Sequence, residues 1–379
     1  MGIDFAQSHR SRLGIEWELA CVDRATGELA PAAPELLGML GDFDGFPLVT
    51  RELLTNTVEL VSAPRALVRD AVGDLVALLD RVRPVADRLG VDLLCSGTHP
   101  FSRALDQRVT PDNPRYDTLL DRTQWWGQQM LIWGVHVHIA VEDRRKVMAI
   151  VDGLLTYLPH LLVLSASSPF WMGEQTGYAS NRSMLFQQLP TAGLPPQFAT
   201  WQEYEAMVGD LLHVGVIDDY SELRWDIRPS PRWGTIEVRA FDGIPTVREL
   251  AAVAALTQCL VEHLSRELDA GRGVPHMQPW FVRENKWRAA RYGMEAIIIQ
   301  NAAGDERLVT EDLDDLVDRL APVAVDLGCS AELDAVRAIP ATGASYQRQL
   351  AVAGRTGSLR AVVETLVADL HQAAPLPPR

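Results

Sequence analysis

Three short segments, far apart in the chain, each place ionisable side chains two residues apart between apolar neighbours. The segments are GIEWEL at 14–19, WGVHVHI at 133–139 and TIEVRA at 235–240. Because side chains alternate between the two faces of a strand, both members of each pair point to the same face of a sheet. The pairs are Glu16 with Glu18, His136 with His138, and Glu237 with Arg239. The sequence therefore predicts a sheet with one apolar face and one face of carboxylates, imidazoles and a guanidinium.

Such a face is either a binding site or the solvated side of edge strands, and its threefold recurrence favours a site, because clustered charges are costly to bury without a ligand. Two more carboxylates, Glu52 and Glu59, occur in RELLTNTVELV (51–61), although Glu59 taken alone fits a solvated strand position. Carboxylates prefer hard cations such as Mg²⁺ or Mn²⁺, and histidine favours Mn²⁺ slightly. The set lacks the His and Cys dominance of a zinc site. These residues predict a site for Mg²⁺, with Mn²⁺ as the alternative ion.

The composition of the chain limits the classes of molecule that it is expected to bind. The 379 residues carry 35 Lys and Arg against 50 Asp and Glu, a net charge of −15, which argues against nucleic acid because phosphate binding needs a basic surface. The most apolar stretch, 147–166, contains Asp, Pro and His and is interpreted as a buried helix, so no membrane span is expected. The four cysteines are widely spaced and residues 1–12 lack an apolar signal region, which together predict reduced thiols and a cytoplasmic protein.

The periodicities predict an α+β fold with an antiparallel sheet and helices on one of its faces. Length alone suggests two or three domains. Helical patterns cover 66–89, 144–165, 201–214, 246–270, 311–327 and 358–372. Strand patterns cover 13–22, 49–52, 57–62, 91–96, 131–141, 223–227 and 235–241. No GxGxxG or GxxxxGK[ST] turn is present, so ATP phosphates would have to be held by metal ions and arginines.

Seven motifs, taken in order, resemble the type 2 glutamate–cysteine ligase family of ATP-dependent carboxylate–amine ligases. They are GIEWEL, RELLTNTVELVS, GTHPF, GVHVHIAV, ASNRSMLFQQLP, RWDIRPSPRWGTIEVRAFD and ENKWRAARYG, and the likeness runs over residues 13–367. The resemblance implies a glutamine-synthetase-like fold, in which a curved antiparallel sheet of about six strands forms a funnel with helices outside. It also implies one catalytic domain over residues 1–379, which replaces the domain number expected from length.

The resemblance also assigns roles to individual residues. The implied metal ligands are Glu16, Glu18, Glu52, Glu59, His136 and Glu237. Arg239 would face the phosphates of ATP, and Arg182 would hold a substrate carboxylate. His138, where relatives often have Asn, is placed among the catalytic residues. Arg228 is a second candidate for binding the nucleotide, with a salt bridge to Asp226 or to a neighbouring strand as the alternative interpretation.

The implied reaction joins a carboxylate and an amine through an acyl phosphate and releases ADP and phosphate. It would use about two or three Mg²⁺ ions and small-molecule amino acid and amine substrates, with glutamate and cysteine as the family pair and other amines as alternatives. An exposed sheet edge would favour a homodimer. Two other functions remain open, namely a guanidino kinase-like phosphotransferase and a non-catalytic relative that binds nucleotide or metal.

Several aromatic residues have a packing interpretation and a functional one. Trp125, Trp126, Trp171, Trp201 and Trp233 are interpreted as packing residues, with stacking on adenine as the alternative. His99 in GTHPF follows a predicted strand, so it is a further candidate for the mouth of the funnel.

Overall fold

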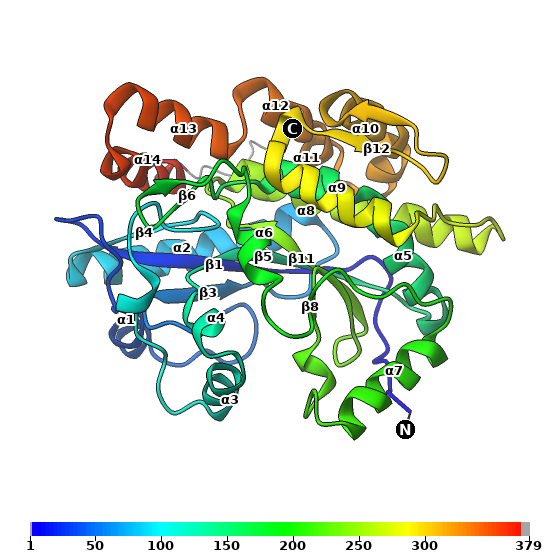
Figure 1. The fold of residues 1–379 in the computed structure, drawn as a ribbon, viewed down its shortest axis with the longest axis horizontal. Helices are drawn as coiled ribbons and strands as arrows, with labels where there is room; N and C mark the ends of the chain where they lie inside the picture. The colour runs from blue at the N-terminus through cyan, green and yellow to red at the C-terminus, as the bar shows by residue number, and fades with distance from the viewer. Residues whose placement is uncertain (1, 373–379) are drawn as a thin grey trace.

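A seven-stranded sheet crosses the middle of the protein in the computed structural model, which describes residues 2–372 (Figure 1). The strands run in the order β10-β11-β5-β1-β3-β2, and β4 pairs with the C-terminal part of β1. All pairings in this sheet are antiparallel. The strands are β1 (Leu13–Asp23), β2 (Leu48–Arg51), β3 (Thr57–Val61), β4 (Val91–Leu94), β5 (Gly134–Ala140), β10 (Ile227–Ser230) and β11 (Thr235–Asp242). The predicted α+β fold with an antiparallel sheet is confirmed, and β4 corresponds to the strand predicted at 91–96.

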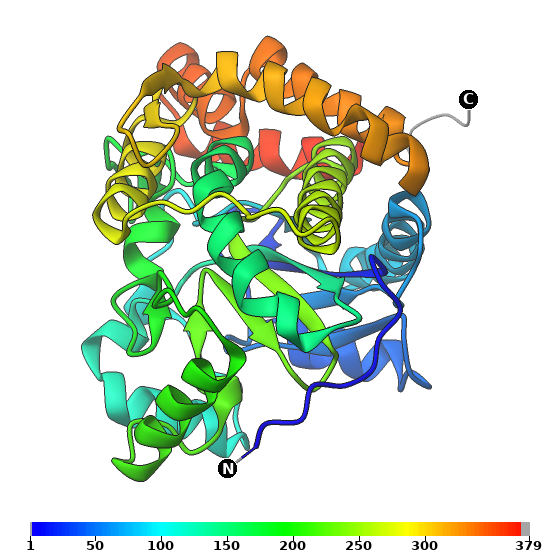
Figure 2. The same cartoon turned by 90° about the vertical axis from the view of Figure 1, so that its right-hand side faces the viewer.

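Three long helices cover the apolar face of the sheet: α2 (Val68–Leu89), α5 (Arg144–Ser165) and α8 (Val247–Asp269). Helix α2 packs on β1, β3 and β4, α5 on β10 and β11, and α8 on β5. Figure 2 shows α5 lying across the sheet, with α8 beside it. The alternate side chains of β1 that point toward these helices, Ile15, Trp17 and Leu19, are fully buried. This burial fixes which side chains of β1 must point to the opposite face.

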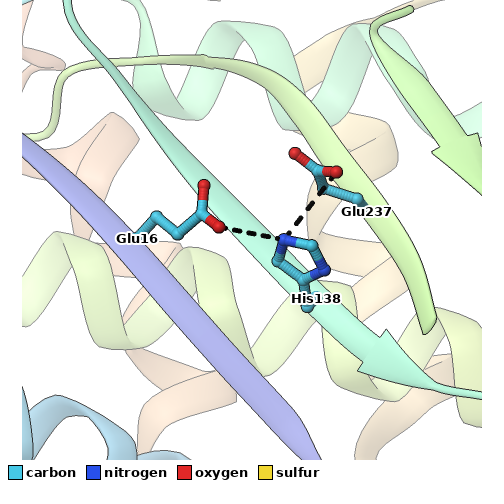
Figure 3. Close-up of side chains that lie close together, drawn as sticks. All are labelled: Glu16, His138 and Glu237. Carbon is cyan, nitrogen blue, oxygen red and sulfur yellow. Dashed lines mark ion pairs between the residues drawn. The ribbon is translucent and has the colours of Figure 1, made fainter. Parts of the chain in front are cut away.

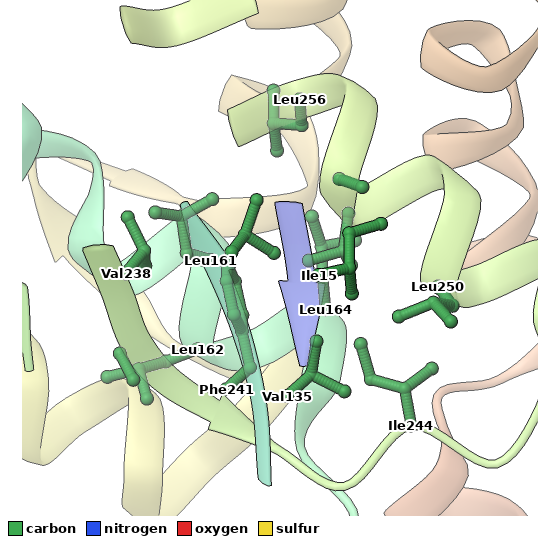
Figure 4. Close-up of a cluster of buried hydrophobic side chains, with 14 of the residues drawn as sticks. Ile15, Val135, Leu161, Leu162, Leu164, Val238, Phe241, Ile244, Leu250 and Leu256 are labelled. Carbon is green, nitrogen blue, oxygen red and sulfur yellow. The ribbon is translucent and has the colours of Figure 1, made fainter. Parts of the chain in front are cut away.

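The core between sheet and helices is made of aliphatic and aromatic side chains from both layers (Figure 4). Ile15, Val135 and Val238 from the strands meet Leu161 from α5 and Leu256 from α8. Helix α5 is long and apolar enough to cross a membrane by composition, but 89% of its most apolar window is buried inside the protein. The predicted buried helix at this place is therefore confirmed.

A second layer of helices covers α5 and α8 on the side away from the sheet, at the top of Figure 1. It contains α9 (Pro279–Tyr292), α10 (Val309–Leu327) and α11 (Ser330–Asp334), which pack on α5 or α8. The chain continues through α12 (Ala338–Thr342) into α13 (Ser345–Thr356) and α14 (Leu359–His371), which pack on each other, and α14 also packs on β4. Each predicted long helix, including α7 (Trp201–His213), agrees with an observed one to within two residues at each end. Among the described residues the four cysteines, Cys21, Cys95, Cys259 and Cys329, are free and buried.

Shorter elements complete the chain. The remaining helices are α1 (Ala33–Leu40), α3 (Pro114–Thr123), α4 (Trp125–Gln128), α6 (Asn181–Phe186), η1 (Ala104–Asp106), η2 (Tyr220–Glu222), η3 (Gly293–Glu295) and η4 (Ala335–Arg337). Three two-stranded sheets pair β6 (Phe170–Trp171) with β7 (Glu174–Gln175), β8 (Ala192–Gly193) with β9 (Arg224–Trp225), and β12 (Ile297–Ile299) with β13 (Glu306–Leu308).

Two local expectations differ from the structure. The strand predicted at 223–227 is divided at Asp226, because β9 pairs in parallel with β8 whereas β10 joins the main sheet. Pro229 lies in β10, where an edge strand tolerates the missing N–H. The helices are also not confined to one face, since α3 and α6 border the polar face. Both are too short for helical periodicity to reveal them.

The division at Asp226 is stabilised by a buried ion pair with α9. Lys286 Nζ lies 2.6 Å from Asp226 Oδ2, and both side chains are at most 5% exposed. The backbone of Asp226 donates to Gly193 O and accepts from Arg239 N, at 2.7 Å in both cases. This pair therefore joins the outer helix layer to the strand that carries Arg239.

Replacing Lys286 by Met tests the importance of this pair for stability. The variant leaves the Asp226 carboxylate buried without a cation, so we expect the free energy of unfolding to fall by about 3–5 kcal/mol. Urea denaturation measures the change. The double variant Lys286→Met with Asp226→Leu removes both charges and should recover most of the loss, and equal destabilisation of single and double variants would contradict this explanation.

Candidate functional site

A cavity of about 540 Å³ opens on the polar face of the sheet. Its walls come from β1, β3, β5, β10 and β11, from α3 and α6, and from the loops around η2 and before β3. Apart from His99, all of the site residues predicted from the sequence line this one cavity. They are Glu16, Glu18, Glu52, Glu59, His136, His138, Arg182, Arg228, Glu237 and Arg239. Residues more than 200 positions apart in sequence are thus brought together, and the predicted pairing of each i and i+2 side chain on one face is observed.

Strand register sets which charged residues face each other. On one side of β1, Glu16 lies opposite His136 of β5, and on the other side Glu18 lies opposite Glu59 of β3. Further along the sheet, Glu237 of β11 lies between His138 of β5 and Arg228 of β10. Side chains directly opposite one another on adjacent strands interact most strongly. Attractive cross-strand pairs therefore lie side by side from β10 to β1, and a repulsive pair of carboxylates follows between β1 and β3.

Glu16 is the centre of the attractive part of this face (Figure 3). His136 Nδ1 lies 2.7 Å from Glu16 Oε2, and His138 Nε2 lies 3.3 Å from Glu16 Oε1 and 3.8 Å from Glu237 Oε2. Burial opposes the ionised form of Glu16, but the two imidazoles outweigh it and lower its pKa. Burial also lowers the pKa of His136 to about 4, so its ring is neutral and donates from Nδ1 to Glu16. The Nε2 lone pair of His136 then remains free to bind a cation.

A second group consists of carboxylates alone. Glu18, Glu52 and Glu59 each place an oxygen within 4.8 Å of the others. Burial, with the neighbouring charge of Glu52, raises the pKa of Glu18 to about 8. Burial and the charges of Glu16, Glu52 and Glu18 raise the pKa of Glu59 well above its usual value. Like charges held this close are stable only when protonated or when they share a cation.

The donor set fits divalent metal ions. Three groups of ligand atoms meet the spacing that one ion needs, namely Glu16 with His138 and Glu237, Glu16 with Glu59 and His136, and Glu18 with Glu52 and Glu59. His138 Nε2 is buried between two carboxylates and has no hydrogen-bond partner, so a polar atom is left for a ligand. Because carboxylate oxygens dominate the groups, they suit Mg²⁺ or Mn²⁺ better than zinc. His138, predicted as a catalytic residue, thus also lies at a ligand position.

Two arginines balance the carboxylate of Glu237, which is 1% exposed. Arg228 Nε lies 2.7 Å from Glu237 Oε2, and Arg239 Nη1 contacts Glu237 Oε1. Arg228 also donates from Nη1 to the backbone oxygens of Ser221 and Leu223. The structure thus contains the salt bridge to a neighbouring strand that was one alternative interpretation of Arg228. It does not contain the other alternative, a salt bridge from Arg228 to Asp226, because Asp226 pairs with Lys286. Anion binding by Arg228 stays a prediction. Arg239 has a buried Nε without a hydrogen-bond partner, so this donor is left for a ligand.

Arg182 lies at the inner end of the cavity, supported from behind by a buried carboxylate. Asp242 Oδ2 accepts from Ser168 Oγ at 2.6 Å, and Ser168 Oγ in turn accepts from the backbone N–H of Arg182 at 3.0 Å. The guanidinium crosses Gly134 so closely that a Cβ there would lie 2.3 Å from Arg182 Nη2. Gly134 also donates its N–H to Glu18 Oε2 at 2.5 Å. Any larger residue at 134 would displace Arg182, whose buried Nε has no partner.

The sequence analysis missed several cavity-lining residues, among them Arg115 and Tyr116 from α3 and Arg224 from β9. Burial, followed by the charge of Arg115, lowers the pKa of Arg224 to about 10. Arg115, Arg224, Arg228 and Arg239 give the cavity a basic part beside its acidic part. A single arginine on a short helix carries no local signal, so only the fold could have revealed this group.

Comparison with known proteins identifies the family. The family model described as "Glutamate-cysteine ligase family 2" matches residues 12–365. The chain belongs to this family. A protein of Clavibacter michiganensis subsp. michiganensis named "Putative glutamate--cysteine ligase 2" is 62% identical over 98% of this chain and 97% of its own length. A protein of the same name from Leifsonia xyli is 58% identical over 97% of this chain and 98% of its own length.

Solved structures share the fold of this glutamate–cysteine ligase family member at low sequence identity. The glutamate–cysteine ligase of Francisella tularensis, in complex with AMP, matches with a TM-score of 0.69 and 13% identity over 97% of this chain and 89% of its own. A bifunctional glutathione synthetase from Pasteurella multocida matches with a TM-score of 0.69 and 14% identity over 95% of this chain and 52% of its own.

His99, a candidate for the cavity mouth, lies elsewhere. Its ring is fully buried, Nε2 donates to Gly27 O at 3.0 Å, and Nδ1 accepts from the backbone N–H of Ser102 at 2.9 Å. It is absent from the cavity lining and fixes two loops instead. Burial lowers the pKa of His99 to about 3, so the ring stays neutral in the folded protein.

The neutral state of His99 predicts a pH dependence of stability. In the unfolded chain this ring takes up a proton below its ordinary pKa of 6.5, whereas in the folded protein it does so only near 3. The stability is therefore complete above pH 6.5 and falls between 6.5 and 3, by roughly 1 kcal/mol per pH unit. Urea denaturation at several pH values should give a flatter curve for His99→Gln than for wild type. Parallel curves for the two proteins would contradict this assignment.

Replacing Glu59 by Gln tests two things: whether the Glu59 carboxyl group destabilises the metal-free protein, and whether it binds a cation. Without metal, the substitution puts a neutral amide in place of a buried carboxyl group whose pKa is raised by burial and by three other carboxylates, so the melting temperature should stay equal or rise. With saturating Mn²⁺, wild type should gain more stability than the variant, because a cation that binds only the folded state stabilises it. Glu174→Gln, at an exposed position outside the cavity, serves as the control and should gain as much as wild type. Equal gains for Glu59→Gln and wild type would argue against Glu59 as a ligand.

Proposed function

We propose that this family member is an ATP-dependent carboxylate–amine ligase. The observation that carries the proposal is the division of one cavity into a carboxylate part able to hold divalent cations and a guanidinium part able to hold anions. The glutamate–cysteine ligase names of the relatives support it, and so does the AMP bound to the Francisella enzyme of the same fold. Glutamate and cysteine are the substrates that these names suggest for this chain.

The chemistry explains why both parts are needed. A carboxylate is a poor acyl donor, because an oxide ion would have to leave. Transfer of the γ-phosphoryl group of ATP to a carboxylate oxygen releases ADP and forms an acyl phosphate. An amine nitrogen then attacks the carbonyl carbon, phosphate leaves with the electron pair of the C–O bond, and the nitrogen loses a proton. The first step brings two anions together, so the site must offset their repulsion.

Each predicted residue can be given a task in this scheme. Glu16, Glu18, Glu52, Glu59, His136 and Glu237 would hold the cations. Bound Mg²⁺ would supply positive charge and Lewis-acid polarisation at the phosphates. Arg239, whose pKa is raised by Glu237 and Glu16 against the effect of burial, keeps a permanent charge toward the γ-phosphoryl group. Arg182, at the inner end, would bind the substrate carboxylate.

His138 adds a proton donor to these charges. Burial opposes its protonation, but Glu237 and Glu16 outweigh burial and raise its pKa. Its Nδ1 contacts Thr235 Oγ1 at 2.9 Å, which orients the ring so that Nε2 faces the two carboxylates. In the proposed reaction, Nε2–H donates to an oxygen of the transferred phosphoryl group when that position holds no metal ion.

Phosphate release from Mg·ATP, measured across pairs of amino acids and amines, tests the proposal. Release should require both a carboxylate and an amine, and mass spectrometry should find the amide. Glu16→Gln and Arg239→Ala should each lower the rate by about 10³-fold or more, since a charge at the transferring phosphoryl group has an effect of that order. The control Glu174→Gln should retain the wild-type rate.

Other outcomes discriminate against the proposal. A phosphorylated substrate with no amide and no free phosphate would indicate a guanidino kinase-like enzyme instead. Metal-dependent ATP binding without turnover for any pair would indicate a non-catalytic relative. An amide formed with amines but not with cysteine would keep the ligase and change its acceptor.

A further inference from the structure

A half-exposed aromatic pair borders the cavity at the turn between β10 and β11. Trp233 lines the cavity and is 48% exposed. Phe46 is 43% exposed, and the two ring centroids lie 5.9 Å apart with the planes at 75°. Of the tryptophans in the described part of the chain, Trp125, Trp126, Trp280 and Trp287 are also exposed, but none of these lines the cavity. Trp233 therefore combines an open aromatic surface with a place at the site.

The turn that carries Trp233 is held in place by the N-terminal segment. Ala6 N donates to Pro231 O at 2.9 Å, and Ser8 Oγ donates to Gly234 O at 2.7 Å. Gly234 has φ of +65°, and a Cβ there would lie 2.1 Å from Ala6 O. Only glycine allows this close approach without strain. The aromatic ring is thus presented on a fixed backbone, which lowers the entropy cost of binding a ligand.

Trp233 is connected to the charged part of the cavity by one short stretch of chain. Glu237 lies four positions further along the chain, which at strand rise corresponds to at most about 13 Å. Cations lie near this path, because the guanidinium carbon of Arg232 is 4.9 Å from the Trp233 ring centroid and Arg228 pairs with Glu237. A ligand suited to this arrangement has a flat aromatic group at one end and phosphates at the other.

We infer that Trp233, buttressed by Phe46, is the stacking platform for the base of the bound nucleotide, an inference that rests on the proposed nucleotide-dependent function. The Arg232 guanidinium lies over the Trp233 ring, and the part of the ring that stays exposed can stack on a base, because every base has a ring face. Trp233 therefore favours binding of nucleotides over polyphosphates that carry no base. It does not by itself distinguish adenine from guanine.

Calorimetric titration with three ligands tests this inference: Mg·ADP, Mg·GDP and magnesium tripolyphosphate. Trp233→Ala should bind both nucleotides roughly 5- to 150-fold more weakly than wild type, the range expected for loss of one base–aromatic stack. Its affinity for tripolyphosphate should not change. Trp233→Phe keeps a ring and should recover most of the nucleotide affinity. Trp280→Ala, which removes an exposed tryptophan outside the cavity, is the matched control and should bind all three ligands as wild type does.

The three ligands distinguish a role of Trp233 in stacking from a role in supporting the turn. They also distinguish failure of this inference from failure of the ligase proposal. Weaker binding of all three ligands by Trp233→Ala would show that the residue only supports the turn, and it would overturn the inference. Unchanged nucleotide affinity in that variant, or a wild-type protein that binds no nucleotide, would also overturn it. Failure of the ligase proposal differs from these results, because nucleotide binding would still depend on Trp233 while no substrate pair released phosphate.

Discussion

The repulsion among carboxylates on the polar face is the constraint around which the rest of the structure is organised. Glu18 and Glu59 lie opposite each other on paired strands, and Glu52 approaches both. Strand pairing alone would not hold this arrangement, because a shift of one residue would turn these side chains to the other face. What prevents the shift is the burial of Ile15 and Trp17 against α2, α5 and α8. The apolar layer thus stabilises the charged one.

The arginines need support as much as the carboxylates do. Arg182 and Arg239 each have a buried Nε without a partner, although Nη1 of Arg239 donates to Glu237 and Nη1 of Arg182 donates to Arg239 O. The backbone N–H groups of both residues are held as well, that of Arg182 by Ser168 beside Asp242 and that of Arg239 by Asp226. Donors aimed into a cavity before a ligand arrives need no rearrangement when it binds. The outer helix layer also helps to hold Arg239, because Lys286 of α9 forms an ion pair with Asp226.

The sequence predicts the faces of the strands better than it predicts what surrounds them. Alternation identified the charged face because period two is a local property, and the long helices were visible for the same reason. Register is not local, so the opposition of Glu18 and Glu59 could not be anticipated. Arg115 lies on a ten-residue helix without a buried side chain, and its approach to the cavity depends on contacts distant in sequence. The Lys286–Asp226 pair was likewise invisible, since both residues look like ordinary surface charges.

The two parts of the cavity depend on each other in a way that bears on the order of binding. With Glu18 and Glu59 kept partly protonated by burial and by each other, cations that enter must displace protons. A nucleotide alone would bring further negative charge toward Glu16 and Glu237. These two carboxylates already offset the positive charges of Arg239 and Arg228, so little positive charge would be left for the phosphates. On the proposed function, divalent cations held by these carboxylates would supply the positive charge that offsets both repulsions. Arrival of the metal ions together with the phosphates would then be favoured over arrival of either one alone.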